Sequence, residues 1–454
     1  MLYCKVAVIL LWSITSCWCL CKLEGQVEDC HCQVETVDKV NNLKIFPLLQ
    51  TLVQYNYFKF YPVNLIKPCP FWHDDNRCVL RHCSVNECKE TELPAGLRGK
   101  PRLLNKSKSA EGSSNDIDND VDCKKYAAEN DVLGKIDSTL TDQDKRAFVG
   151  WKQHDDSGDN FCDIDDENAS DVKYVNLLLN PERFTGYGGK SAHRIWKTIY
   201  NENCFTPAKS YKDIAISGFT QGLCLEKRAF FRLISGMHAS VNIHLSAIYL
   251  LPDTKATFMR GKSSFRWGPN VHEFQNRFSS ENTNGEGPLK LKNLYFAYLV
   301  LLRAVTKAAP YWEKMDFYTG NATEDESVKR IILDIVSIAK SNCNGSFDET
   351  ELFAGEPEKA LALKVKEFRD HFRNISKIMD CVGCNKCRLW GKIQVRGIGT
   401  ALKILFSVKN EALNNADKFH LKRPEIISLI NTLARFSESI REIHNFKELM
   451  KGRK

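Results

Sequence analysis

The stretch Cys381-Val382-Gly383-Cys384-Asn385-Lys386-Cys387 places three thiols within seven residues, between two long amphipathic patterns that each predict a helix. Lys386 and Arg388 flank the last thiol. Positive charge beside a cysteine favours the thiolate, which is the form that attacks disulfides, transfers electrons or binds metal. The stretch therefore indicates either redox chemistry or a metal site.

Redox chemistry is the better of these two interpretations. Three cysteines could hold zinc or an iron–sulfur cluster, but no fourth Cys or His lies at the usual spacing. A purely structural role for all three thiols is a further alternative, although a glycine-containing hinge beside crowded thiols is a poor scaffold for inert bonds. We expect no metal. Cys384 and Cys387 then form a closely spaced pair that can open and close, and Cys381 can bridge elsewhere.

The N-terminus predicts the cellular compartment. Residues 1–18 read as a secretory signal peptide, with Lys5 as its basic start and an apolar core from Val6 to Trp12. Later apolar runs are too short or too charged to span a membrane. We therefore expect a luminal or secreted protein, an oxidising environment for its thiols. Five glycosylation sequons agree with this address: Asn105, Asn168, Asn321, Asn344 and Asn374.

The remaining sequence predicts one mainly α domain over residues 19–454, with a helical core in residues 174–454. Residues 225–251 are apolar on nearly every face and predict a central buried helix. Further helical patterns follow Pro288, cover residues 328–338, follow Pro357 and follow Pro424. Almost no stretch alternates with period two. The net charge of +8 comes without a long basic run, so we expect no nucleic-acid partner.

Clustered cysteines indicate loops tethered by disulfides. Residues 19–32 carry two Cys-x-Cys pairs, which predict a two-disulfide clasp. Residues 69–125 hold Cys78, Cys83 and Cys88 with little apolar content, and residues 99–122 are polar and charged, so this segment predicts a mobile loop.

The charges next to these thiols separate attacking cysteines from holding ones. Cys78 follows Arg77 and Cys83 follows Arg81-His82, so both pKa values should be lowered. Cys123 follows Asp122, and Cys162 lies among carboxylates, which raise a thiol pKa. Cys123 and Cys162 are therefore poor nucleophiles but suitable disulfide partners.

A dithiol that releases two electrons needs an acceptor, and a helical oxidase without metal usually carries a flavin. The usual glycine-rich nucleotide motifs are absent, since Gly186 to Ser191 lacks the first glycine of a phosphate loop and Gly397-Ile-Gly399 lacks the third glycine. Side chains on helices must then hold the cofactor. Ser235 and His238 lie one turn apart on the central helix, although His238 alone could be a core histidine.

Several motifs, spread over nearly the whole mature chain, resemble those of a known protein family. They are Cys69-Pro-Phe-Trp72, Asp159-Asn-Phe-Cys162, Asn180-Pro-Glu-Arg-Phe-Thr-Gly-Tyr187, Glu226 to His238, Gly285-Glu-Gly-Pro288 and His371 to Gly391. Together they resemble the endoplasmic reticulum oxidoreductin family, flavin-dependent thiol oxidases that make disulfides and pass them to protein disulfide isomerase.

The resemblance implies a helix-bundle core that holds FAD, and an electron relay. Cys78–Cys83 would be the outer dithiol, which meets the isomerase or related thioredoxin-fold proteins. Cys384–Cys387 would be the inner dithiol beside FAD, with Cys384 exchanging with the outer pair. Molecular oxygen would be the final acceptor and hydrogen peroxide the product. The implied location is the endoplasmic reticulum lumen, where a peripheral position on the membrane face is compatible with the chain.

The resemblance also implies particular site residues. Flavin contacts would be Arg183, Thr185, Trp196, Ser235, His238, Arg277 and Lys290. Lys290 stands where the family usually has arginine, so its charge is kept but a bidentate contact is lost. Structural disulfides would be Cys19–Cys32, Cys21–Cys30, Cys69–Cys381 and Cys204–Cys224. Regulatory bonds would join Cys78 to Cys123, and Cys83 to Cys88 or Cys162. Cys343 has no family counterpart and is expected in a loop.

Two other classes of protein stay open at this stage. A non-enzymatic secreted glycoprotein would hold all its cysteines in inert bonds. A zinc-binding luminal chaperone would keep its thiols reduced and carry stoichiometric metal. A bound yellow chromophore and readily reducible disulfides would distinguish the oxidase from both.

Overall fold

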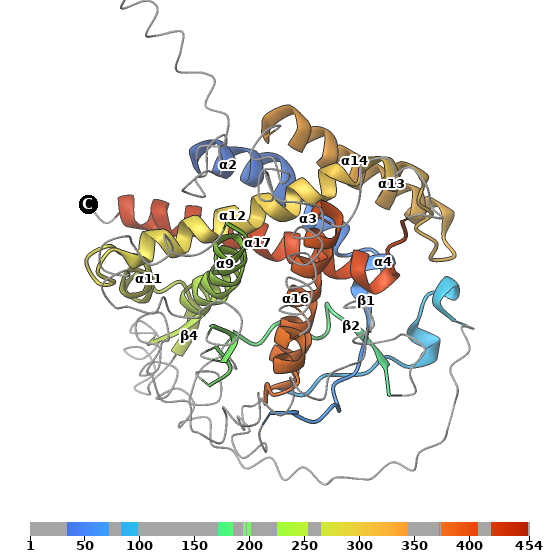
Figure 1. The fold of residues 1–454 in the computed structure, drawn as a ribbon, viewed down its shortest axis with the longest axis horizontal. Coiled ribbons are helices and arrows are strands. Elements are labelled where there is room, and N and C mark those ends of the chain that lie inside the picture. The colour runs from blue at the N-terminus through green and yellow to red at the C-terminus, as the bar shows by residue number, and fades with distance from the viewer. Residues whose placement is uncertain are drawn as a thin grey trace, which may run out of the picture.

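Four long helices form the centre of the molecule (Figure 1). They are α9 (Leu225–Ala247), α12 (Glu286–Lys307), α16 (Asn385–Phe406) and α17 (Arg423–Lys451). Helix α16 packs extensively along α17, and α9 packs along α12. The mainly α fold class predicted from the sequence is confirmed.

The computed structural model describes only part of the chain. The described residues are 34–71, 83–98, 171–184, 194–196, 198–200, 225–252, 265–343, 372, 374–406 and 419–452. The predicted signal peptide and the 19–32 clasp lie outside these ranges, as does most of the predicted 69–125 loop.

Shorter elements surround the four central helices. The N-terminal part runs through α2 (Val34–Val40), the π-helical η2 (Asn41–Ile45), α3 (Phe46–Leu52) and α4 (Asn56–Lys59). Two 3-10 turns follow, η3 (Glu90–Glu92) and η4 (Ala95–Leu97). Helices α11 (Val271–Phe278), α13 (Ala309–Lys314) and α14 (Ala322–Cys343) lie between the central helices α9 and α16 in the sequence. Cys343 is thus the last residue of a helix and does not lie in the expected loop.

Proline and glutamate positions explain where the long helices begin. Pro288 lies in the first turn of α12, where its missing N–H costs no hydrogen bond. Gly285 precedes that helix with φ of 85°, a left-handed conformation that favours glycine. Pro424 occupies the same kind of position in α17, and the buried Glu425 accepts the Lys422 N–H at 2.7 Å. The helix starts predicted at Pro288 and Pro424 are therefore confirmed, whereas the one predicted at Pro357 lies outside the described residues.

The sequence pattern did not predict two small antiparallel sheets. Strand β1 (Phe60–Val63) pairs with β2 (Lys173–Asn176), and β3 (Tyr249–Pro252) pairs with β4 (Phe265–Gly268). The helix predicted over residues 225–251 therefore ends too late, because α9 ends at Ala247. Pro252 disfavours helical backbone in the residue before it, and pairing with β4 satisfies the strand instead.

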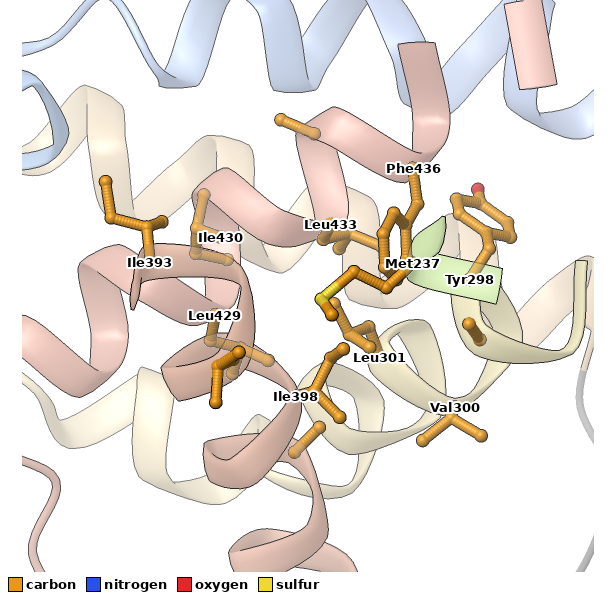
Figure 2. Packing of buried hydrophobic residues seen from close by; sticks show 14 of the residues in the cluster. Met237, Tyr298, Val300, Leu301, Ile393, Ile398, Leu429, Ile430, Leu433 and Phe436 are labelled. Atoms are coloured by element: carbon orange, nitrogen blue, oxygen red, sulfur yellow. The ribbon is translucent and has the colours of Figure 1, made fainter. Parts of the chain in front are cut away.

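The core lies where the four long helices meet (Figure 2). Met237 from α9 and Leu301 from α12 point toward Ile398 of α16 and Phe436 of α17, and all four are buried. A Cβ at Gly397 would lie 2.2 Å from Thr432 Oγ1, so this glycine permits the close approach of α16 and α17. No helix within the described ranges has the length and apolarity needed to cross a membrane.

Candidate active site

The inner thiols lie at the beginning of α16. Cys384 directly precedes the helix and its carbonyl accepts the Arg388 N–H at 2.8 Å, while Cys387 lies in the first turn. Both side chains are buried, with exposed fractions of 1% and 0%. The positive end of a helix dipole stabilises a thiolate at this position. Complete burial opposes this effect, because it disfavours the charged form of a thiol.

Cys384 is bonded to Cys83, 301 residues away in the sequence. This differs from the resemblance, which implies Cys384–Cys387 as one pair and Cys78–Cys83 as the other. The same bond replaces the implied regulatory link from Cys83 to Cys88 or Cys162. Cys387 Sγ instead donates to the Arg183 carbonyl oxygen at 3.0 Å.

Main-chain contacts explain why Cys83 meets Cys384. The Cys83 carbonyl accepts the Lys386 N–H at 3.0 Å, which joins the segment to the first turn of α16. The Cys88 N–H donates to the Tyr174 carbonyl at 2.8 Å on β2. Residues 83–88, part of the segment predicted as a mobile loop, are therefore docked between β2 and α16 in this structure.

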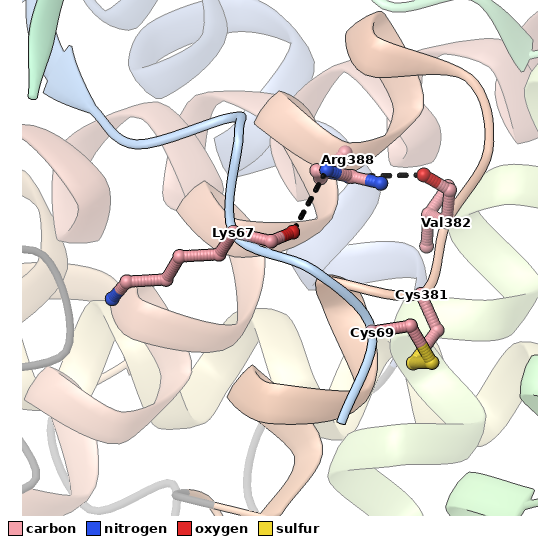
Figure 3. Close-up of a disulfide and its surroundings, with 5 residues drawn as sticks. All are labelled: Lys67, Cys69, Cys381, Val382 and Arg388. Carbon is pink, nitrogen blue, oxygen red and sulfur yellow. Dashed lines mark hydrogen bonds between the residues drawn. A yellow bond between two sulfur atoms is a disulfide. The ribbon is translucent and has the colours of Figure 1, made fainter. Parts of the chain in front are cut away.

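A second disulfide joins Cys69 to Cys381, as the resemblance implies (Figure 3). Arg388 reinforces this link. Its Nε donates to the Val382 carbonyl at 3.0 Å, and one terminal nitrogen donates to the Leu65 carbonyl at 2.6 Å. The same nitrogen lies 3.4 Å from the carbonyl oxygen of Lys67. The guanidinium thus bridges the cysteine-bearing turn and the extended segment that ends at Cys69.

Lys392 makes a parallel link one turn further along α16. Its ammonium lies 2.6 Å from Asp380, next to Cys381, and both side chains are almost fully buried. It also donates to the Asn64 carbonyl at 3.1 Å. A buried charge is stable only when it is paired, so Lys392 and Asp380 hold the cysteine turn in one arrangement.

The predicted flavin contacts that are described converge from several elements. Trp196 stacks on His238 of α9, with ring centroids 3.9 Å apart. Burial, followed by the charges of Lys290 and Arg277, lowers the pKa of His238 to about 3. These two cations come from α12 and α11, so their effect places them near the histidine. The imidazole is neutral at physiological pH.

Hydrogen bonds fix the orientation of the same side chains. Arg277 donates to Asn242 at 2.7 Å and pairs with Glu273 at 3.2 Å. Ser235 Oγ accepts from Asn293 Nδ2 at 3.0 Å. The Tyr200 hydroxyl lies 3.1 Å from His238 Nδ1, and Lys290 pairs with Glu286 at 3.0 Å.

Residues 180–184 connect the thiols to this cluster, a role that the sequence did not reveal. Glu182 accepts from Arg435 at 2.6 Å and from Gln394 at 3.0 Å, so it joins α17 to α16. Phe184 stacks on His244 of α9, and the Arg435 guanidinium lies 4.3 Å from the centre of the Phe184 ring. Within the Asn180-Pro-Glu-Arg-Phe motif and the residue after it, the resemblance implies roles for Arg183 and Thr185 alone.

The side chains present fit an aromatic dinucleotide such as FAD. Trp196 and His238 supply aromatic faces, and Arg277 and Lys290 supply cations for a diphosphate. Arg183 Nε is buried without a hydrogen-bond partner among the described residues, which suits a polar ligand group. The Arg183 backbone contacts Cys387, so this arginine links the thiol to the cluster.

Other predicted site residues have different outcomes. Several of them lie outside the described residues: Thr185, the cysteines Cys78, Cys123, Cys162, Cys204 and Cys224, and the sequons at Asn105, Asn168 and Asn344. Cys88 is half-buried beside β2. Asn321 is exposed just before α14, whereas Asn374 is half-buried in a helical stretch. The described ranges hold no cluster of three potential metal ligands.

Comparison with known proteins gives consistent matches over the chain. The family model for Endoplasmic Reticulum Oxidoreductin 1 (ERO1) matches residues 44–443. ERO1-like protein alpha of Sus scrofa is 47% identical, covering 96% of this chain and 92% of the relative. Ero1-like protein of Drosophila melanogaster is 46% identical, covering 95% and 91%.

Solved structures agree with these sequence matches. One, described as Ero1p, source of disulfide bonds for oxidative protein folding in the cell, is 31% identical with a TM-score of 0.57. That match covers 93% of this chain and 99% of the solved one. A mutant of S. cerevisiae Ero1p is 30% identical, with a TM-score of 0.58 and coverage of 92% and 98%.

Proposed function

The chain belongs to the ERO1 family, oxidoreductases of oxidative protein folding in the endoplasmic reticulum, and we propose that it is a luminal thiol oxidase that makes disulfides and transfers them to protein disulfide isomerase. Cys78 and Cys83 form the outer dithiol, and Cys384 and Cys387 form the inner one. Bound FAD would supply the route from the inner dithiol to molecular oxygen, with hydrogen peroxide as the product.

Thiol–disulfide exchange between the two pairs is the central step. The Cys83 thiolate attacks Cys384 Sγ, the Cys384–Cys387 bond breaks, and Cys387 leaves as a thiolate. The Cys78 thiolate then attacks Cys83 Sγ, so that Cys83–Cys384 breaks and Cys384 leaves. The outer pair is then oxidised, the inner pair has gained two electrons, and the two outer thiol protons pass to the surroundings.

The disulfide between Cys83 and Cys384 is the observation that carries this proposal. It is the mixed disulfide between an outer and an inner cysteine that the exchange requires. Cys387, whose sulfur lies 3.0 Å from the Arg183 carbonyl oxygen, would be the leaving group.

Residues around Cys387 support a flavin as the electron acceptor. When bound, FAD would take two electrons from the inner dithiol and pass them to oxygen. Trp196 and His238 would bind the ring systems, while Arg183, Arg277 and Lys290 would neutralise the diphosphate. Ser235 would donate or accept a hydrogen bond, and Thr185 is assigned by family resemblance alone.

Exposed apolar side chains support a protein partner. Phe265 and Trp267 lie two residues apart on β4, and their exposed fractions are 59% and 52%. Alternate residues of a strand share one face, so these rings form a common apolar surface. Clustered exposed aromatics are typical of protein-binding surfaces. This surface suits a protein partner such as the isomerase.

Oxygen consumption by the purified protein tests the proposed function. We expect flavin absorption bands, and oxygen uptake when a reduced thioredoxin-fold protein is added. Cys384→Ala should abolish uptake, because the inner disulfide can no longer form, while flavin stays bound. The matched control is Cys343→Ala, which changes a cysteine at the end of α14 and should leave uptake intact.

Each possible result has a distinct meaning. A colourless protein without oxygen uptake would refute the oxidase. Loss of flavin in Cys384→Ala would recast this cysteine as structural. Full uptake in that variant would show that electrons do not pass through the inner pair.

A further inference from the structure

Asn180 lies between the segment that carries Cys83 and the helix that carries the inner thiols. Its side chain is completely buried. Oδ1 accepts the Asn86 N–H at 2.7 Å, and Nδ2 donates to the Asn86 carbonyl at 3.0 Å. One amide therefore binds both backbone groups of a single residue, as a neighbouring β-strand would.

Further bonds fix the position of this amide. Nδ2 also donates to the Asn176 carbonyl at 2.9 Å, at the end of β2. The Asn180 carbonyl accepts the indole N–H of Trp390 at 2.8 Å, which ties residue 180 to α16. Asn180 thus connects β2, α16 and the 83–88 segment, and its side chain has little freedom to turn.

Asn86 is three residues after Cys83, so its contacts determine where that sulfur can lie. The Cys83 carbonyl is bonded to the Lys386 N–H, and the Cys88 N–H is bonded to Tyr174. The amide of Asn180 holds the backbone midway between these two points. An asparagine is needed because aspartate cannot donate, and alanine would leave two backbone groups without these partners.

We propose that Asn180 is the positioning residue that presents Cys83 to Cys384. The inference rests on the proposed function and deepens it, since it identifies what aligns the exchange between the outer and inner dithiols. Asn180 contacts no reacting sulfur. It places the Cys83 thiolate for attack on Cys384, with Cys387 departing and accepting the electron pair of the broken bond.

The equilibrium of the Cys83–Cys384 disulfide measures how well the two cysteines are aligned. In a background with both Cys78→Ala and Cys387→Ala, neither neighbouring thiol can resolve the Cys83–Cys384 bond. Full-length protein is then equilibrated in a glutathione buffer, acid-quenched, alkylated and mapped by mass spectrometry. Asn180→Ala should lower the equilibrium constant for the Cys83–Cys384 disulfide about tenfold or more, as expected for two lost hydrogen bonds. An unchanged constant would overturn the proposal.

Two substitutions of the exposed Asn86 avoid any defect caused by changing a buried residue. Asn86→Pro removes the N–H that Asn180 accepts, and should lower the same equilibrium constant. Asn86→Ala keeps both backbone groups and should not, because the bonds to Asn180 do not involve this exposed side chain. Equal values in these two variants would also overturn the proposal.

Kinetics separate this inference from the proposed function. With Cys78 and Cys387 both present, Asn180→Ala should slow oxygen uptake driven by a reduced thioredoxin-fold protein. The exposed change Asn86→Ala should leave that uptake unchanged. No uptake in the unmodified protein would refute the oxidase itself, whereas unchanged uptake in Asn180→Ala would refute only the positioning role.

Discussion

The turn that carries the inner cysteines and the segment that carries Cys83 meet at one disulfide but are held in different ways. The turn is buried and fixed by the Cys69–Cys381 disulfide, by Arg388 and by the Lys392–Asp380 ion pair. The 83–88 segment is half-buried or exposed, and main-chain hydrogen bonds and the asparagine amide hold it.

This difference matches the work proposed for each part. Neutral hydrogen bonds contribute about 1 kcal/mol each and can be exchanged for water, whereas the Cys69–Cys381 disulfide lasts until it is reduced and a buried ion pair resists separation. A relay needs a fixed acceptor and a donor that can leave to meet its partner. The two regions have the stabilities that such a division requires.

Removing the Cys69–Cys381 disulfide, which holds the inner turn, should have the largest effect on the free energy of unfolding. The bond spans 312 residues of sequence, and closing a loop of this order stabilises the folded state by about 5 kcal/mol. Cys69→Ser with Cys381→Ser should lower the free energy of unfolding by this order, measured with urea in a Cys83→Ser background, where no Cys83–Cys384 bond closes nearly the same loop. The paired change avoids leaving a thiol near Cys384.

The control for this loss is a change on the other side of the comparison. Cys88→Ser alters a cysteine of the docked segment and should change the free energy of unfolding far less. Equal losses in the two proteins would show that the inner turn is not the more firmly held region.

Breaking the buried ion pair should have the next largest effect. Lys392→Met leaves the Asp380 carboxylate buried without its cation, and such a loss costs about 3–5 kcal/mol. The free energy of unfolding should fall by that order. Lys392→Met combined with Asp380→Asn should recover part of it, because no isolated charge is left. A double variant less stable than Lys392→Met would contradict this account.

The sequence predicted the parts of this comparison that depend on local pattern. Apolar spacing and the prolines at 288 and 424 indicated the long helices, and the charges beside Cys83 and Cys387 indicated reactive thiols. The family resemblance added Cys69–Cys381. These features are properties of neighbouring residues or of quoted motifs.

Contacts between distant segments could not be predicted in the same way. The Arg388 side chain bonds Leu65, 323 residues away, and Asn180 bonds Asn86, 94 residues away. Neither asparagine nor arginine is unusual in its local sequence, so nothing signals these roles. The strand over residues 249–252 was missed for the same reason, since its partner at 265–268 makes it a strand.

Acidification should weaken the buried region by a smaller amount and spare the segment that carries Cys83. Burial lowers the pKa of His238 to about 3, and burial with the nearby Arg435 charge lowers the pKa of His244 well below its usual value. In the unfolded chain each pKa is about 6.5, so below that pH the unfolded state binds more protons and the folded state loses stability. Each histidine should remove about 2 kcal/mol between pH 7 and pH 5.

Comparing the protein with His244→Gln at both pH values measures this contribution. Glutamine can keep a hydrogen bond to Ser439, which lies 3.1 Å from His244 Nε2, but it does not titrate. The variant should therefore lose about 2 kcal/mol less than the unmodified protein on acidification. Amide exchange, corrected for intrinsic rates, should show less protection of α9 at pH 5 than at pH 7. Residues 83–98 should keep their protection, so the difference in protection between the two regions should be large only at neutral pH. An identical pH dependence in both proteins would mean that His244 becomes protonated in the folded state, and that the helix beside the inner thiols is less tightly closed than its burial indicates.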